Sequence, residues 1–273
     1  MKKLITILLC LLTTVAYSQK GKNNAPNFNI GDFQYKSEIA EWLFQYDLVA
    51  WWTSDSVMVQ DKREIERLGK EWFCYQDESK NWHAVYGKFS DGNFSQVFHF
   101  TVDSTANVKR TNDQVDSALA NSYSRALSIA GQRVEHALGD SINIKFNQFI
   151  RRNDDQTISV WMLPAFQQDY TAVYGVEFIY TINSLGDTVL KDNSYYKGKP
   201  RGFKVDKPRE IWLNYGDVEA PTLGSIFFVL YYRKYFTSIY IDCQNSTTTF
   251  FKDADGRYTW IHAAKEPQKK KRK

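Results

Sequence analysis

The sequence lacks every short motif that would identify a chemistry by itself. It has no HExxH for zinc, no CxxC pair, no GxSxG turn around a nucleophile, no Walker loop and no GxGxxG after a strand-like run. Some active sites have no local signature, but here no residue set predicts a catalytic, cofactor-binding or metal site. We therefore expect a non-catalytic binding or structural protein without a cofactor, and a hydrolase of cell-envelope polymers is the alternative.

Long apolar runs are missing after the first residues. Segment 1–18 has two lysines, an apolar run over 4–12 and the small residues Ala16 and Ser18 at its end, which is typical of a signal peptide cleaved after that serine. The run is shorter than the roughly 20 apolar residues that cross a bilayer. The chain as a whole looks like exported proteins of Gram-negative bacteria. We therefore expect the periplasm or the outer surface, and no transmembrane segment.

The body of the chain lacks an excess of charge of either sign. Residues 19–264 contain 27 basic and 30 acidic residues, so they offer no basic face for a nucleic-acid backbone, and we expect no nucleic-acid partner. The basic residues concentrate in the tail 265–273, where six of nine are Lys or Arg. Such a run predicts a disordered, solvated tail. Weak contact with an anionic surface is the alternative.

Cysteine is scarce: only Cys74 and Cys243 remain after the signal peptide. Both lie in predicted strands, and an oxidising compartment permits them to pair. A disulfide would join the first part of the fold to its last sheet. The alternative is two buried free thiols.

Hydrophobic periodicity predicts an α+β fold, with a large, mainly antiparallel sheet and two helices. An extended leader is expected over 19–36, an N-terminal helix over about 38–53, and the long helix over about 112–138, ended by Gly139. The rest of the body alternates like strands separated by turn residues. We expect a single domain over 37–264, with a subdivision near 104–111 as an option.

The stretch 223–241, LGSIFFVLYYRKYFTSIYI, is the most apolar part of the body. Arg233 and Lys234 would fall in the middle of a membrane span, which argues against one. The β-branched and aromatic residues favour strands over 225–232 and 238–243. A helix over 223–236 is the alternative, because periodicity does not decide for a short apolar run.

Aromatic residues make up 16% of the chain, and they suggest where a ligand could bind. The segment 197–210, KGKPRGFKVDKPRE, is the loop where an anionic or sugar-like ligand could bind through guanidinium groups and aromatic rings, and a solvated charged loop is the alternative. The partner would be a protein or a glycan of unknown identity. The candidate ligand residues are Arg201, Lys204, Arg209, Tyr196 and Trp212.

Three smaller features compete with plain structural explanations. A hairpin of 71–76 with 81–89 would put Cys74 opposite His83, with His99 on the next strand, as in a thiolate or zinc site; aromatic strands also bury such residues as packing. The segment 252–258, KDADGRY, is similar to the start of a calcium loop but also fits a hairpin turn. Glu177, inside an apolar strand, is the carboxylate that the hydrolase alternative would use.

The triplet Asp, Ser or Thr, then a small or aliphatic residue occurs five times, where composition predicts on the order of one. It is similar to the acceptor sequence of a general O-glycosylation system of some Gram-negative bacteria. Recurrence of Asp-Ser pairs at helix caps and turns is the competing explanation. The intact mass of the secreted protein would separate the two. The acceptor candidates are Ser56, Ser104, Ser117, Ser141 and Thr188.

Overall fold

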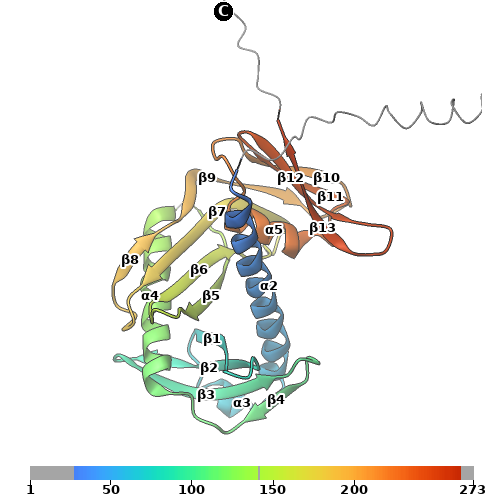
Figure 1. The fold of residues 1–273 in the computed structure, drawn as a ribbon. Helices are drawn as coiled ribbons and strands as arrows, with labels where there is room; N and C mark the ends of the chain where they lie inside the picture. Colours follow the sequence, from blue (N-terminus) through green and yellow to red (C-terminus); the bar gives the residue numbers. More distant parts are fainter. Residues whose placement is uncertain (1–27, 141, 266–273) are drawn as a thin grey trace, which may run out of the picture.

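A computed structural model describes residues 28–140 and 142–265 (Figure 1). The predicted signal peptide 1–18, residues 19–27 of the leader, Ser141 and residues 266–273 of the tail lie outside the described residues. The described chain mixes helices with three mostly antiparallel sheets, which confirms the predicted α+β class.

The first sheet, sheet A, is an antiparallel meander at one end of the molecule (Figure 1). Its first two strands form the hairpin expected over 71–76 and 81–89, and a tight turn at Asp91-Gly92 leads into the third. The helix α3 (Lys62–Ile65) precedes it. The strands are β1 (Glu71–Gln76), β2 (Trp82–Ser90), β3 (Asn93–Val102) and β4 (Val108–Thr111).

The second sheet, sheet B, contains the long strand β7 (Thr171–Ile182) and forms the centre of the molecule. Both β8 (Val189–Asp192) and β9 (Tyr195–Lys204) pair with β7, β9 along residues 171–177 and β8 along residues 180–182. The register between β7 and β9 shifts at Gly175, whose φ is +76°. This left-handed backbone favours glycine. On the other side of β7 lie β6 (Ile158–Pro164) and β5 (Phe146–Arg152).

The third sheet, sheet D, includes the one parallel pair of strands among the described residues. The strands β10 and β11 are parallel, so the chain must cross over between them, and α5 (Leu223–Tyr232) makes this crossover. The strands are β10 (Glu210–Tyr215), β11 (Ser238–Cys243), β12 (Ser246–Lys252) and β13 (Tyr258–Ala264).

The predicted strand over 225–232 is therefore wrong, and the helical alternative is what forms. Thr222 caps α5, since its hydroxyl accepts the N–H of Ser225. The helix is buried on nearly all sides, so its aromatic residues pack against α2, β7 and β11 regardless of their strand propensity. Within the described residues, no helix has the length and apolarity to cross a membrane.

The helix α2 (Ile30–Met58) packs beside the sheets and is longer than predicted (Figure 1). It has 29 residues against 22 in α4 (Ser117–Leu138), so the expected order of lengths is reversed. The extended leader is wrong over 30–36, where the chain is already helical. Phe33 explains the early start, because its ring packs edge-on against Trp260 and His262 of the last strand. This contact is invisible in the local sequence.

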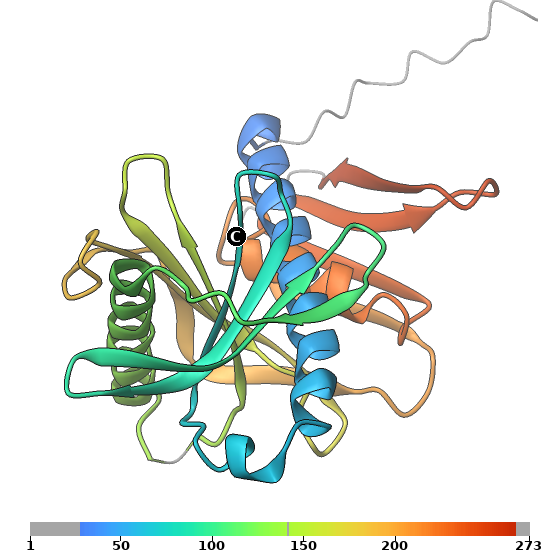
Figure 2. The ribbon, with the colours of Figure 1, turned by 90° about the horizontal axis from the view of Figure 1, so that it is seen from below.

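Two apolar cores lie on opposite faces of sheet B. The larger core joins α2 and α5 with residues of all three sheets, including Phe149, Trp161 and Leu163. The smaller core packs α4 against the other face, through alternate residues such as Val160 and Tyr180. Figure 2 shows α4 and α2 on either side of these strands. The face that carries Trp161 extends beyond the cover of α2 and α5.

Candidate functional site

The predicted ligand loop 197–210 is mostly the strand β9, and its candidate residues do not gather at one site. Arg201 lies over the ring of Tyr174, 4.9 Å from its centroid, and donates to the carbonyl of Asn214. The ammonium of Lys204 lies 2.6 Å from the carboxylate of Asp169. Both cations already have partners, so neither is placed for an anionic ligand.

The other three candidates point in different directions. Tyr196 packs against Phe178 in the core beneath α4. Arg209 donates to the backbone carbonyl of Lys204 at 3.1 Å. Trp212 is half exposed on the outer face of sheet D, where it stacks on Tyr240 at 4.4 Å. The structure therefore replaces the predicted loop with separate packing contacts.

The two cysteines are free and buried, so of the two options the structure shows two thiols and no disulfide between them. The backbone N–H of Cys74 donates to the hydroxyl of Tyr46 on α2 at 2.8 Å, whereas Cys243 ends β11 in sheet D. Burial raises the pKa of both thiols, that of Cys243 to about 12. Such thiols are poor nucleophiles.

Cys74 also does not meet His83. In the observed register Cys74 is paired with Ala84 and Tyr75 with His83, one residue away from the assumed register. Successive residues of a strand point to opposite faces, so the thiol and the imidazole lie on different sides of sheet A. The proposed thiolate or zinc arrangement is wrong, and the described residues contain no cluster of ligands that could hold a metal ion.

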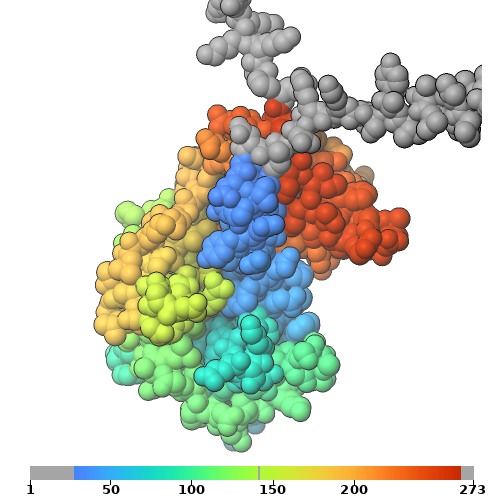
Figure 3. All heavy atoms as spheres, viewed as in Figure 1, coloured from blue at the N-terminus to red at the C-terminus, as the bar shows by residue number. Residues whose placement is uncertain are grey.

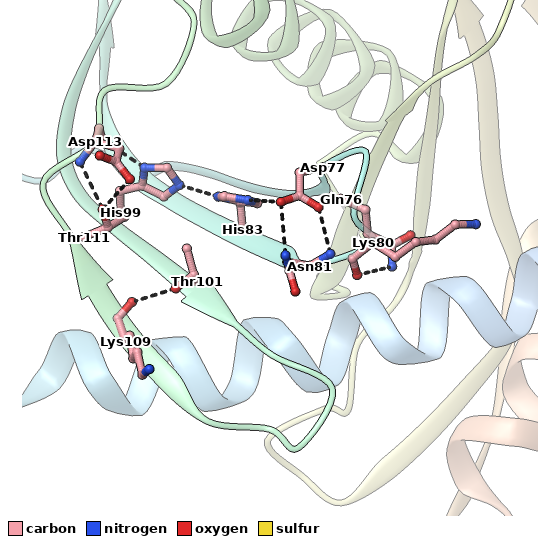
Figure 4. Close-up of polar contacts among 10 residues, drawn as sticks. All are labelled: Gln76, Asp77, Lys80, Asn81, His83, His99, Thr101, Lys109, Thr111 and Asp113. Atoms are coloured by element: carbon pink, nitrogen blue, oxygen red, sulfur yellow. Dashed lines mark hydrogen bonds and ion pairs between the residues drawn. The ribbon is translucent and has the colours of Figure 1, made fainter.

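The two histidines do meet, and they form a polar chain across sheet A (Figure 4). Nδ1 of His83 lies 2.8 Å from Nε2 of His99, and Nδ1 of His99 lies 2.9 Å from the carbonyl oxygen of Asp113. At the other end, Nε2 of His83 lies 3.3 Å from the carboxylate of Asp77. The ring of Tyr75 stacks on His83 at 4.7 Å.

The carbonyl of Asp113 fixes the tautomer of His99, since a carbonyl only accepts. Nδ1 of His99 must carry the hydrogen, which leaves Nε2 to accept from Nδ1–H of His83. Burial lowers the pKa of His99, so this ring stays neutral at about pH 7. Long-range ¹H–¹⁵N spectra should show His99 as the Nδ1–H tautomer, and an Nε2–H signal would contradict this chain.

Glu177 is buried and accepts three hydrogen bonds. The hydroxyls of Tyr215 and Thr222 donate to its Oε1 at 2.9 and 2.6 Å, and the N–H of Gly224 donates to Oε2 at 2.8 Å. Burial raises the pKa of Glu177, as expected, against these bonds, which favour the ionised form. The carboxylate holds β7 to the start of α5, which is a structural role.

Asp47 is a buried carboxyl that sequence reasoning missed. It lies on α2 and accepts a hydrogen bond from Nδ2 of Asn147 at 2.8 Å. Burial raises the pKa of Asp47 to about 7, although a hydrogen bond from Tyr231 lowers it. A signal was available, because Asp47 shares the helical face of Leu43 and Ala50, both buried. An acid at such a position is unusual.

The calcium-like segment 252–258 forms the turn between β12 and β13, as the structural alternative predicted. Asp253 and Asp255 both pair with Arg257, at 3.2 and 3.0 Å.

The O-glycosylation candidates Ser104, Ser117 and Thr188 are exposed. Ser56 is half-buried within α2, where its hydroxyl donates to the carbonyl of Trp52.

A groove of about 1010 Å³ lies between the N-terminal half of α2 and the open face of sheet B. Figure 3 shows this side of the molecule, with α2 in blue and the β7–β9 region in gold. Tyr35 and Lys36 of α2 line one wall, and Thr222 and Leu223 at the start of α5 close one end. The β5–β6 turn forms part of the rim.

Four side chains form a polar row along the floor of the groove. Arg151, Ser159, Thr181 and Lys191 are register partners on β5, β6, β7 and β8. Neighbouring strands lie about 4.8 Å apart, so the row spans on the order of 14 Å. The alternate residues of the same strands point towards α4, which is why the row faces the groove.

Arg151 is half-buried at one end of this row, beside two tryptophan rings that contact each other. Its guanidinium carbon lies 5.2 Å from the ring centroid of Trp42 and 5.6 Å from that of Trp161. Over residues 28–140 and 142–265, no ion pair involves Arg151 or Lys191. By contrast, the groove residue Asp32 is paired with Lys36 at 2.6 Å.

Comparison of the chain with protein-family models, with curated proteins and with solved structures finds no significant match.

Proposed function

We propose that this is an exported, non-catalytic binding protein of the periplasm or outer surface of a Gram-negative bacterium, which holds an extended polar ligand in the groove between α2 and sheet B. The observation that carries the proposal is the polar row on the floor of the groove. A sheet face covered by neither helix would normally be a plain solvated surface. Here α2 forms a wall beside the sheet face, and the hydroxyl and cationic groups of the polar row line the same cavity.

The hydrolase alternative has less support. Its carboxylate, Glu177, accepts hydrogen bonds from Tyr215, Thr222 and Gly224 and is only 2% exposed. Hydrolysis by paired carboxylates needs a second one roughly 5–9 Å away. The small pocket beside Glu177 has no other acidic side chain among the described residues of its lining. Glu177 also lines the groove, but there Asp32 is paired with Lys36, and Asp154 and Asp155 are exposed in the turn at the rim.

The substitution Thr181→Trp tests the binding groove. An indole at the centre of the floor should fill the space that a ligand needs, and we expect binding to fall at least about tenfold. Thr259→Trp is the matched control, since Thr259 is an exposed strand residue on sheet D. The measurement is binding of the purified proteins to an array of defined oligosaccharides and peptides. Equal binding by Thr181→Trp and the unchanged protein would contradict the proposal.

A further inference from the structure

We propose that the ligand of the groove is an acidic glycan, whose carboxylates bind Arg151 and Lys191. This inference rests on the proposed binding function and adds the chemical class of the ligand. It starts from two cations at opposite ends of the polar row, about 14 Å apart by strand spacing. Between them lie the neutral hydroxyls of Ser159 and Thr181.

Arg151 is positioned for an anion but has none in its own chain. Contact with Trp42 and Trp161 restricts the side chain and removes part of its hydration. The stacked guanidinium keeps N–H donors at its edge, and no described residue accepts a hydrogen bond from them. A planar donor group held in this way suits bidentate binding of a carboxylate.

Arg152, the next residue, shows the difference between a structural and an available arginine. Its side chain points to the other face of sheet B and donates to the Ser122 hydroxyl of α4 at 2.9 Å. Lys191, at the far end of the row, is exposed and has no carboxylate partner among the described residues. The groove therefore offers two available cations, both on its floor.

The lining favours a glycan over a peptide. Peptides add to free strand edges or insert apolar anchors into pockets. The floor consists of strand faces, with β6 and β7 paired on both sides, so it offers no edge there. Of the apolar lining residues, Trp161, Ile39 and Leu223 are almost fully buried and so form no anchor pocket, whereas Tyr35 on the α2 wall is exposed. Hydroxyl and amide side chains suit sugar hydroxyls instead. The remaining polar lining includes Asn193, together with Asn153 and Thr157; the amide of Asn153 hydrogen-bonds the hydroxyls of Thr157 and Ser159.

The spacing of charges favours carboxylates that are separated by neutral sugars. Two cations about 14 Å apart cannot neutralise a ligand with a charge at every unit. The exposed residues Asp154 and Asp155, in the turn at the rim, would also repel a densely charged polymer. An oligosaccharide that alternates acidic and neutral sugars fits this pattern.

Calorimetric titration with a hyaluronan hexasaccharide, which alternates uronate and neutral sugars, tests the inference against neutral chitohexaose. We expect the acidic chain to bind at least about tenfold more tightly, since a charge-assisted pair contributes on that order. Arg151→Gln and Lys191→Gln should each remove most of this preference. Arg257→Gln, in the exposed β12–β13 turn, is the matched control and should not change it.

Equal affinity for the two hexasaccharides, unchanged in both variants, would overturn the inference and leave the groove as a binding site for neutral ligands. Binding of peptides alone, sensitive to Thr181→Trp, would also overturn it while the binding function stands. Should Arg151→Gln fail to fold, Lys191→Gln decides alone, because Lys191 is exposed and lacks an ion pair among the described residues.

Discussion

Replacing Asp47 with asparagine should raise the free energy of unfolding at about pH 8 by about 2–4 kcal/mol. The carboxyl is 7% exposed, and burial raises its pKa to about 7, so at this pH it is ionised in an environment that disfavours the charge. Asparagine keeps the oxygen that accepts from Asn147 and carries no charge. Denaturant titration of both proteins measures the difference.

The effect should depend on pH with a definite sign. The folded-state pKa of Asp47 lies above its ordinary value of 3.8, so the folded state binds more protons between about pH 4 and 7. Stability of the unchanged protein should therefore fall as pH rises through that window, and the gain from Asp47→Asn should vanish near pH 4. Asp55→Asn, an exposed position on the same helix, should stay within about 0.5 kcal/mol of the unchanged protein. Equal or lower stability of Asp47→Asn at pH 8 would contradict this explanation.

Replacing Gly224 with alanine should lower the free energy of unfolding by about 3 kcal/mol, since an unsatisfied buried carboxylate is among the costliest local changes. A Cβ at this position would lie 2.3 Å from Cγ and Cδ of Glu177. The carboxyl would have to move, and its bonds to Tyr215, Thr222 and the backbone N–H of residue 224 would break.

The same substitution in a Glu177→Ala protein shows whether the contact with Glu177 causes the loss of stability. In Glu177→Ala the colliding carboxyl is gone, so Gly224→Ala should then cost little or even stabilise the first turn of α5, because alanine favours helices over glycine by up to about 1 kcal/mol. Gly131→Ala is the matched control in α4, where an added Cβ meets nothing within 4 Å. A full loss of stability on the Glu177→Ala background would show that another contact is responsible.

The fold class follows from periodicity, but several elements depend on contacts that local sequence does not contain. The run 225–232 has strand residues, yet it is a helix because β10 and β11 are parallel and need a crossover. Residues 30–36 have the composition of a loop, yet Phe33 finds Trp260 and His262 more than 220 positions away. Tertiary packing decides both cases.

The candidate site could not be found by searching for clusters along the chain. Residues 197–210 attracted attention because basic and aromatic residues are close in sequence, and the strand β9 then directed them to separate partners. The polar row draws one residue from each of four strands, so it becomes visible only with the register. What sequence did contain was the alternation that sends Arg151 and Ser159 to one face and their neighbours to the other.

The groove is tested most directly by ¹H–¹⁵N spectra of the labelled protein during titration with the hyaluronan hexasaccharide. We predict that the largest shifts fall on the amides of Ser159, Thr181 and Lys191 and on the indole of Trp161, which line one cavity. Shifts confined to the outer face of sheet D, around Trp212 and Tyr240, would contradict the groove as the binding site.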